Sequence, residues 1–155
     1  MNEQVKDILA HLRGHMGMYD QAAQVLDQKS QNVLSATSFV LAVVGTLQAQ
    51  HFSVISLIPL GIAVFLYIRM FFLTTRSLGP KEFLYPMNAE WDNLQEYVQM
   101  DGKQYVDQLM SDYIEYIENN RRIVEGKADR VAQALWLFFD IVVLLLISAF
   151  IGMIC

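Results

Sequence analysis

The sequence predicts an all-α integral membrane protein with three transmembrane helices, an N-terminal amphipathic helix and a helical insert between the second and third spans. Two observations about composition carry this prediction. Hydrophobic residues make up 54% of the 155 residues and charged residues only 17%, whereas soluble domains carry about a quarter charged residues. The apolar residues also gather in three blocks instead of spreading along the chain.

Residues 1–32 are predicted to form an amphipathic helix on the cytosolic side of the membrane. Its apolar residues alternate at spacings of four and three, the seam of a helix that packs on another helix. They are Val5, Leu9, Leu12, Met16, Tyr19, Ala23 and Leu26. Gly14 and Gly17 weaken this helix and could break it. A helix lying in the membrane interface is the alternative, but its polar face mixes both charges instead of being basic.

Three blocks are candidates for membrane spans. Residues 33–49 lie at the low end of the roughly 17–25 residues that a span needs, which leaves room for a tilted or shallow helix. Residues 54–73 form a stronger second span, and the short connection predicts a transmembrane hairpin over 33–76. Residues 131–155 hold the third span, in which Asp140 is the sole charged residue.

Residues 77–130 are predicted to be a helical insert in the cytosol. Gly-Pro and Tyr-Pro pairs punctuate its start, and Asn88 is a plausible helix N-cap. Asp101-Gly102 reads as a turn. From Lys103 a second apolar seam runs on, so we expect one long helix that continues into the third span. Asn120 occupies a seam position, where a polar residue can fix the register between helices.

The positions of Lys and Arg predict the orientation, because loops rich in these residues stay in the cytosol. Three of them precede the first span, none lies in the first loop, seven lie in or beside the second loop, and none follows the third span. The N-terminus and the 77–130 insert are therefore expected in the cytosol and the C-terminus outside. The first apolar block starts only after about thirty residues, so no cleaved signal peptide is expected.

Two charged residues lie inside the predicted spans. A carboxylate in hydrocarbon costs at least about 2.5 kcal/mol on insertion scales, so Asp140 should face protein or water. At helical rise, Arg69 lies about 10 Å from Arg76, and Asp140 about 15 Å from Arg130. We expect the two to pair at similar depth, within one chain or across a subunit interface. A gate or water-filled pathway lined by Asp140, or a proton relay, is the alternative.

The sequence shows no catalytic, cofactor or metal site. His11 and His15 have metal-ligand spacing, but neither the Glu of the protease pattern nor a nearby Cys accompanies them. No phosphate-binding glycine loop and no nucleophile motif occurs. The net charge of −5 argues against bulk nucleic-acid binding, which needs a basic face. We therefore expect a protein that is not an enzyme.

Two matched segments lead into membrane helices. Asp27-x-Lys29-Ser30 precedes span one, and Glu125-Gly-Lys127 precedes span three. Both place an acid and a lysine at the membrane edge, either as a snorkelling lysine with a counter-ion or as a hinge. Small residues spaced by four in the spans weakly favour association between helices, and three spans are few for a pore within one chain, so a homo-oligomer is expected.

The layout as a whole resembles a known group of proteins. Asp27-x-Lys29-Ser30 and a hairpin of two spans are followed by Leu78-Gly79-Pro80, a Trp-bearing helix, and a long helix with Asn119-Asn120 and Lys127. This arrangement resembles the small membrane effectors of bacterial antiphage immunity, namely the Pycsar-type transmembrane effectors and the SLATT-like effectors of CBASS systems. The resemblance covers nearly the whole chain as layout.

This resemblance implies an oligomeric effector of the bacterial inner membrane that perturbs or permeabilises the bilayer when a nucleotide messenger triggers it. No separate ligand-binding domain is visible. A nucleotide's phosphates or a hinge would involve the basic residues near the membrane edge and the seam asparagine. These are Lys29, Lys81, Arg121, Arg122, Lys127 and Asn120. The basic residues read equally well as positive-inside anchors. A membrane-anchored regulatory subunit that docks a cytosolic protein and a holin-like pore former are the competing interpretations.

Overall fold

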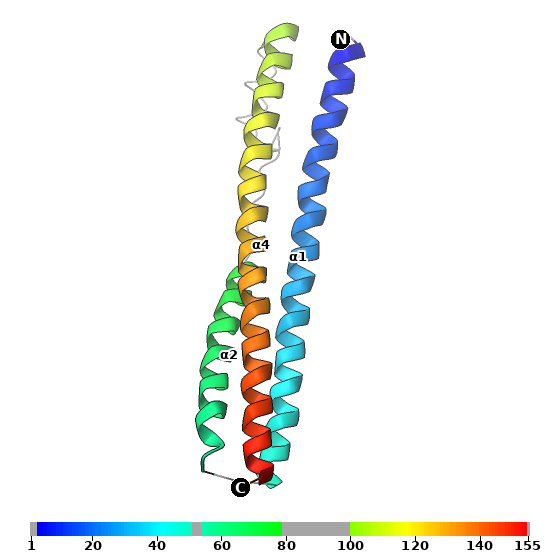
Figure 1. Cartoon of the computed structure of the whole chain (residues 1–155). Coiled ribbons are helices and arrows are strands. Elements are labelled where there is room, and N and C mark those ends of the chain that lie inside the picture. Colours follow the sequence, from blue (N-terminus) through cyan, green and yellow to red (C-terminus); the bar gives the residue numbers. More distant parts are fainter. Residues whose placement is uncertain (1–2, 51–53, 79–99, 155) are drawn as a thin grey trace. The chain divides into compact units, whose positions relative to one another are not determined.

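The computed structural model describes residues 3–50, 54–78 and 100–154 (Figure 1). Their regular structure consists of three helices: α1 (Glu3–Gln50), α2 (Leu57–Leu78) and α4 (Gly102–Ile154). Each is long and apolar enough to cross a membrane. This confirms the predicted all-α class with three membrane-length helices. The expected N-cap at Asn88 and the expected ligand Lys81 lie outside the described residues.

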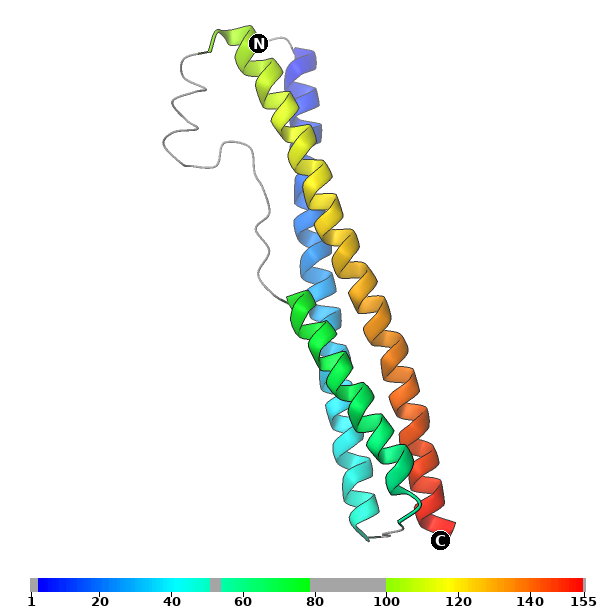
Figure 2. The ribbon, with the colours of Figure 1, turned by 90° about the vertical axis from the view of Figure 1, so that its left-hand side faces the viewer.

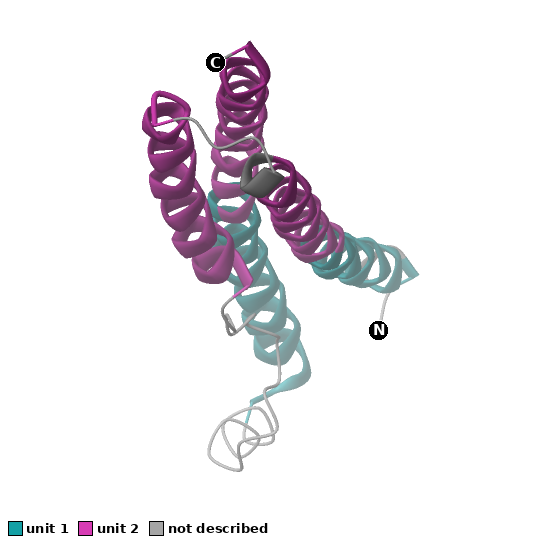
Figure 3. Cartoon of the chain, turned by 90° about the horizontal axis from the view of Figure 1, so that it is seen from below, with its two compact units in different colours: residues 1–24, 80–126 teal, residues 25–79, 127–155 magenta. Residues whose placement is uncertain are grey.

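The chain divides into two compact units (Figure 3). Unit 1 comprises Met1–Gln24 and Pro80–Gly126, and unit 2 comprises Val25–Gly79 and Lys127–Cys155. In the described part of unit 1 the buried apolar cluster contains Leu9, Met16, Leu109 and Tyr113. Unit 2 contains all three predicted spans, with a core drawn from all three helices.

Helix α1 continues without a break where the sequence suggested a separate helix over 1–32 and a span over 33–49. Gly14 and Gly17 do not interrupt it. Both are exposed, and a Cβ atom added at either would meet nothing within 4 Å. Each glycine costs roughly 1 kcal/mol of helix propensity relative to alanine. Burial of Leu9 and Met16 on the other face offsets that cost, because one buried large apolar side chain contributes about 1.5–3 kcal/mol.

Helix α4 starts at a defined cap. The Asp101 Oδ1 atom accepts hydrogen bonds from the backbone N–H groups of Lys103 (2.9 Å) and Gln104 (2.8 Å). A side-chain oxygen that satisfies the free N–H groups of the first turn is the usual N-cap arrangement. The Asp101-Gly102 pair therefore begins the helix, which then runs as one element through the third predicted span, as the seam after Lys103 predicts.

In each helix, one set of buried positions recurs every seven residues. A seven-residue interval keeps one stripe of a helix facing its neighbours and is typical of coiled-coil packing. The positions are Leu9, Met16, Ala23, Ser30, Thr37 and Val44 in α1; Ser56, Ala63, Met70 and Ser77 in and just before α2; and Tyr113, Asn120, Lys127, Ala134, Ile141 and Ser148 in α4. We call these positions the heptad seam. Small and polar residues are frequent in it, as in membrane helices that approach closely.

Within unit 2, α2 lies beside α1 and α4 (Figures 1 and 2). The Thr37 hydroxyl of α1 contacts the Met70 sulfur of α2 at 3.5 Å, and Ser38 and Tyr67 share a hydrogen bond of 2.9 Å. Ser148 of α4 donates a hydrogen bond to a backbone carbonyl at the start of α2, at 2.7 Å. These contacts fix α2 antiparallel to α1 and to α4 in unit 2.

The outer faces of unit 2 carry large apolar side chains. Exposed apolar residues include Phe39, Val43, Leu47, Ile58, Ile62, Phe65, Ile68, Phe72, Trp136, Phe139, Val143, Leu146, Phe150 and Met153. Apolar surface this continuous is not tolerated by a monomer in water. Lipid chains would cover such a surface, so the three helices are compatible with a membrane location.

Candidate functional site

The polar groups of unit 2 centre on an ion pair between α1 and α4. The Lys127 ammonium donates hydrogen bonds to both carboxylate oxygens of Asp27, at 2.7 and 2.8 Å. The Lys127 side chain is only 4% exposed, whereas Asp27 is 33% exposed. The lysine thus depends on this carboxylate for most of its compensation, because a buried ammonium is costly without a partner. The pair joins the two membrane-edge segments that the sequence singled out.

Two buried hydroxyl groups lie in the same part of the heptad seam. Ser30 and Ser77 are fully buried, and their Oγ atoms have no hydrogen-bond partner among the described residues. One seven-residue step from the Thr37–Met70 contact, taken along both antiparallel helices, leads to these two serines. Thr37 and Thr74 instead bond to the carbonyl four residues earlier. The heptad seam therefore contains two buried hydroxyl groups without hydrogen-bond partners among the described residues, and Ser30 lies three residues after Asp27.

Asp140 lies on the outer face of α4. It is exposed and sits among exposed apolar neighbours: Trp136, whose side chain is 73% exposed, Phe139 and Val143. Within the described ranges Asp140 has no ion-pair partner. The expected pair with Arg69 does not form within one chain. An ion pair between Asp140 of one subunit and Arg69 of another stays a prediction.

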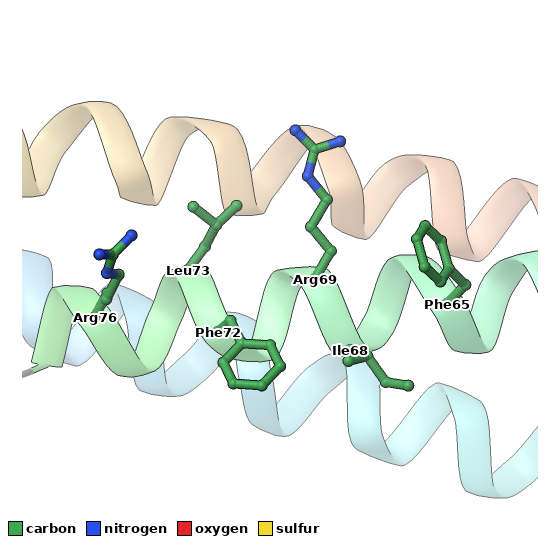
Figure 4. Close-up of a pocket in the computed structure, with 6 residues that line it drawn as sticks. All are labelled: Phe65, Ile68, Arg69, Phe72, Leu73 and Arg76. Carbon is green, nitrogen blue, oxygen red and sulfur yellow. The ribbon is translucent and has the colours of Figure 1, made fainter.

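Arg69 and Arg76 line a hollow on the surface of α2. The hollow has a volume of about 360 Å³, and its remaining lining residues are Phe65, Ile68, Phe72 and Leu73. Figure 4 shows both guanidinium groups projecting from the same side of α2, with Leu73 between them. Both arginines are exposed and have no ion-pair partner in the described part of the chain.

The described residues suggested for phosphate binding or a hinge belong to two units: Asn120, Arg121 and Arg122 to unit 1, and Lys29 and Lys127 to unit 2. In unit 1, Arg121 pairs with Glu118 at 3.0 Å and with Glu125 at 3.8 Å, and Arg122 pairs with Glu118 at 3.4 Å. All these partners lie one turn away on the same helix, the geometry of solvated surface pairs worth little each. Asn120, also in unit 1, is buried at its seam position.

In unit 2, Lys29 is exposed near the Asp27–Lys127 pair but takes no part in it. Lys127 itself is held by Asp27 and does not face solvent.

Two pairs of side chains in the described part of unit 1 also make close polar contacts. The Arg13 Nε–H donates to the Tyr113 hydroxyl at 3.1 Å, and this hydrogen bond raises the pKa of Arg13 above its ordinary value. The His11 and His15 Nε2 atoms are 3.3 Å apart. No group of three or more His, Cys, Asp or Glu side chains suited to a metal ion occurs in the described ranges.

Sequence reasoning missed the pairing of Asp27 with Lys127 and the unpartnered serines. A signal for the ion pair existed: the two edge segments are alike, and each precedes a span. They were interpreted as a lysine with its own neighbouring acid, not as one acid and one lysine that meet across two helices. Comparison with family models, with curated proteins and with solved structures finds no match to this chain.

Proposed function

We propose that the protein is an oligomeric membrane effector whose copies assemble over the Asp140 face of α4 and, when triggered, permeabilise a bacterial inner membrane. The observation that supports this is the position of Asp140 on an apolar outer face without an ion-pair partner in the described chain. A carboxylate exposed to lipid is costly, so intramembrane acids face protein or water.

Assembly of several copies would remove this cost. Trp136, Phe139 and Val143 surround the carboxylate with exposed apolar surface, which a second copy can cover while Asp140 faces a shared polar interior. One chain supplies three membrane-length helices, few for a pore of its own. A ring of copies with inward carboxylates would favour cation passage, because rings of acidic side chains select cations.

The trigger and the setting rest on the resemblance and on charge. The resemblance to antiphage membrane effectors favours a nucleotide messenger or a cytosolic protein as the signal, received without any catalytic step by the effector. The positive-inside pattern favours a cytosolic N-terminus and a cytosolic 77–130 insert, with the C-terminus outside. In this arrangement the Asp27–Lys127 pair lies at the cytosolic edge of the bilayer.

The test measures membrane potential with a dye in cells that express the full chain, alone and beside candidate nucleotide-making enzymes. Three chains are compared: wild type, Asp140→Asn and Asp129→Asn. Asp129 is an exposed acid eleven residues earlier on α4, close to three full turns and hence on the same face, but before the predicted span. Asp140→Asn should abolish depolarisation while chemical crosslinking still shows the oligomer, and Asp129→Asn should behave as wild type.

Other outcomes would change the assignment. Full depolarisation by Asp140→Asn would contradict the role of this carboxylate. Depolarisation of wild-type cells without any partner enzyme would favour a holin-like pore. Depolarisation in no combination would favour a membrane-anchored regulatory subunit, whose partner would then be sought by copurification with the full chain.

A further inference from the structure

The surface hollow on α2 holds two arginines toward one end, with apolar residues between them, and apolar residues alone at the other end. Arg76 stands two residues from the end of α2 at Leu78, Arg69 lies two turns deeper, and Phe65 and Ile68 lie deeper still. We propose that this hollow binds an anionic phospholipid, with the phosphate against the two guanidinium groups and an acyl chain along the apolar end.

The length of the hollow suits one lipid chain in one leaflet. Phe65 and Arg76 are eleven residues apart, about 16 Å along a helix. That is close to half of the roughly 30 Å hydrocarbon thickness of a bilayer. The basic end coincides with the end of the span, where headgroups lie, and the apolar end with its middle.

The charge of the hollow selects the headgroup. Neither guanidinium has an ion-pair partner in the described chain, and Arg69 is too deep to be hydrated without snorkelling. Guanidinium groups bind phosphate oxygens through paired, charge-assisted hydrogen bonds. A zwitterionic lipid brings its own cation to the same place, whereas an anionic lipid leaves its charge free for the arginines. Basic pockets beside transmembrane helices recognise anionic headgroups in this way.

This site does not depend on the proposed pore, because it lies on one helix of one chain. The other candidate for Arg69 is the Asp140 carboxylate of a second copy. That pairing would use Arg69 alone and would leave Arg76 without a role. The lipid uses both arginines and the apolar residues between them, so it accounts for more of the observed lining.

The full chain in detergent is titrated with dioleoylphosphatidylglycerol or dioleoylphosphatidylcholine, and bound lipids are counted by native mass spectrometry. Wild type is compared with Arg69→Gln, Arg76→Gln and the matched control Arg130→Gln. Ser148 of α4 contacts Ser56, and the two helices are antiparallel, so Arg130, 18 residues before Ser148, lies level with Thr74, 18 residues after Ser56. Arg130 is therefore at a depth between Arg69 and Arg76, but it does not line the hollow. Circular dichroism verifies that each variant keeps its helix content.

Wild type should bind dioleoylphosphatidylglycerol in preference to dioleoylphosphatidylcholine. Each Arg→Gln substitution in the hollow should lower that preference about fivefold, the effect of one basic residue near an anionic surface. Arg130→Gln should leave it unchanged, and Arg69→Lys should retain most of it.

Equal binding of the two lipids would overturn the proposal. An equal loss in Arg130→Gln would also overturn it, because the attraction would then be general. Displacement by inorganic phosphate at matched concentration would reassign the hollow to a free anion. Loss of the oligomer in Arg69→Gln with an unchanged lipid preference would assign Arg69 to the Asp140 of a second copy.

Discussion

Removal of the Asp27 carboxylate should destabilise unit 2 more than any other single charge change in it. Asp27→Asn leaves the Lys127 ammonium, 4% exposed, without a counter-charge and with little access to water. Breaking a buried pair from one side costs about 3–5 kcal/mol. Asp27 is one-third exposed, and an asparagine oxygen still accepts a hydrogen bond, so we expect a loss of about 2–3 kcal/mol in the free energy of unfolding.

The assay is unfolding of the full chain in mild detergent by increasing SDS, followed by circular dichroism. The reverse change, Lys127→Met, leaves a carboxylate that is partly hydrated and should cost about 1–2 kcal/mol. The double variant should recover to within about 1 kcal/mol of wild type, because the unpaired charge is gone. Lys29→Met removes an exposed lysine two residues away and should change stability by less than about 0.5 kcal/mol.

The comparison between Asp27→Asn and Lys29→Met tests whether the Asp27–Lys127 ion pair stabilises the protein more than a surface charge does. Equal effects would show that the pair contributes no more than a surface charge. A double variant as unstable as the worse single variant would show that the loss comes from packing and not from the unpaired ion.

Three further predictions follow from polar groups in the two units. Ser77→Ala removes a buried hydroxyl without a partner and should leave stability unchanged or raise it by up to about 1 kcal/mol; in the same SDS titration, a loss above 1 kcal/mol would mean that the hydroxyl is bonded. Tyr113→Phe deletes the acceptor of the Arg13 hydrogen bond and should cost about 0.5–1 kcal/mol in thermal unfolding; no change would assign that contact no net value. Burial and, to a lesser extent, the charges of Asp112 and Glu115 raise the pKa of Tyr116 in the folded protein. The contribution of Tyr116 to folding stability is therefore complete below pH 10 and is lost as the pH rises through its folded-state pKa. Tyr116→Phe should remove a tyrosinate absorbance step above pH 10, and an unchanged titration curve would contradict this.

Much of the fold could be predicted because it depends on local patterns. Apolar blocks of membrane length predict the three membrane-length helices, and the seam from Lys103 predicts the continuity of α4. Gly14 and Gly17, which could have broken the first helix, lie within an uninterrupted α1. Helix propensity is a weak term of about 1 kcal/mol for each glycine, and the packing of Leu9 and Met16 outweighs it.

The site was less predictable because pairing between helices depends on register and rotation. Depth along the chain suggested Asp140 and Arg69 as partners, but both are exposed and no ion pair joins them within the chain. Asp27 and Lys127 are separated by 100 residues, and only the angular positions of both on their helices bring them together. Local spacing also cannot show that Ser30 and Ser77 lack acceptors, since most helical hydroxyls find one in the preceding turn.

The unbroken course of α1 and α4 limits the kinds of motion by which a signal can travel. Each helix contributes residues to both units without a loop between them. A flexible linker can absorb a displacement at one end, whereas a continuous helix of fixed rise passes it to the other end as rotation, tilt or axial translation. A translation that restores the heptad seam would advance by seven residues, about 10 Å. Smaller responses are therefore confined to twisting and tilting of whole helices, which are quantities that spin-label distance measurements along α1 can follow.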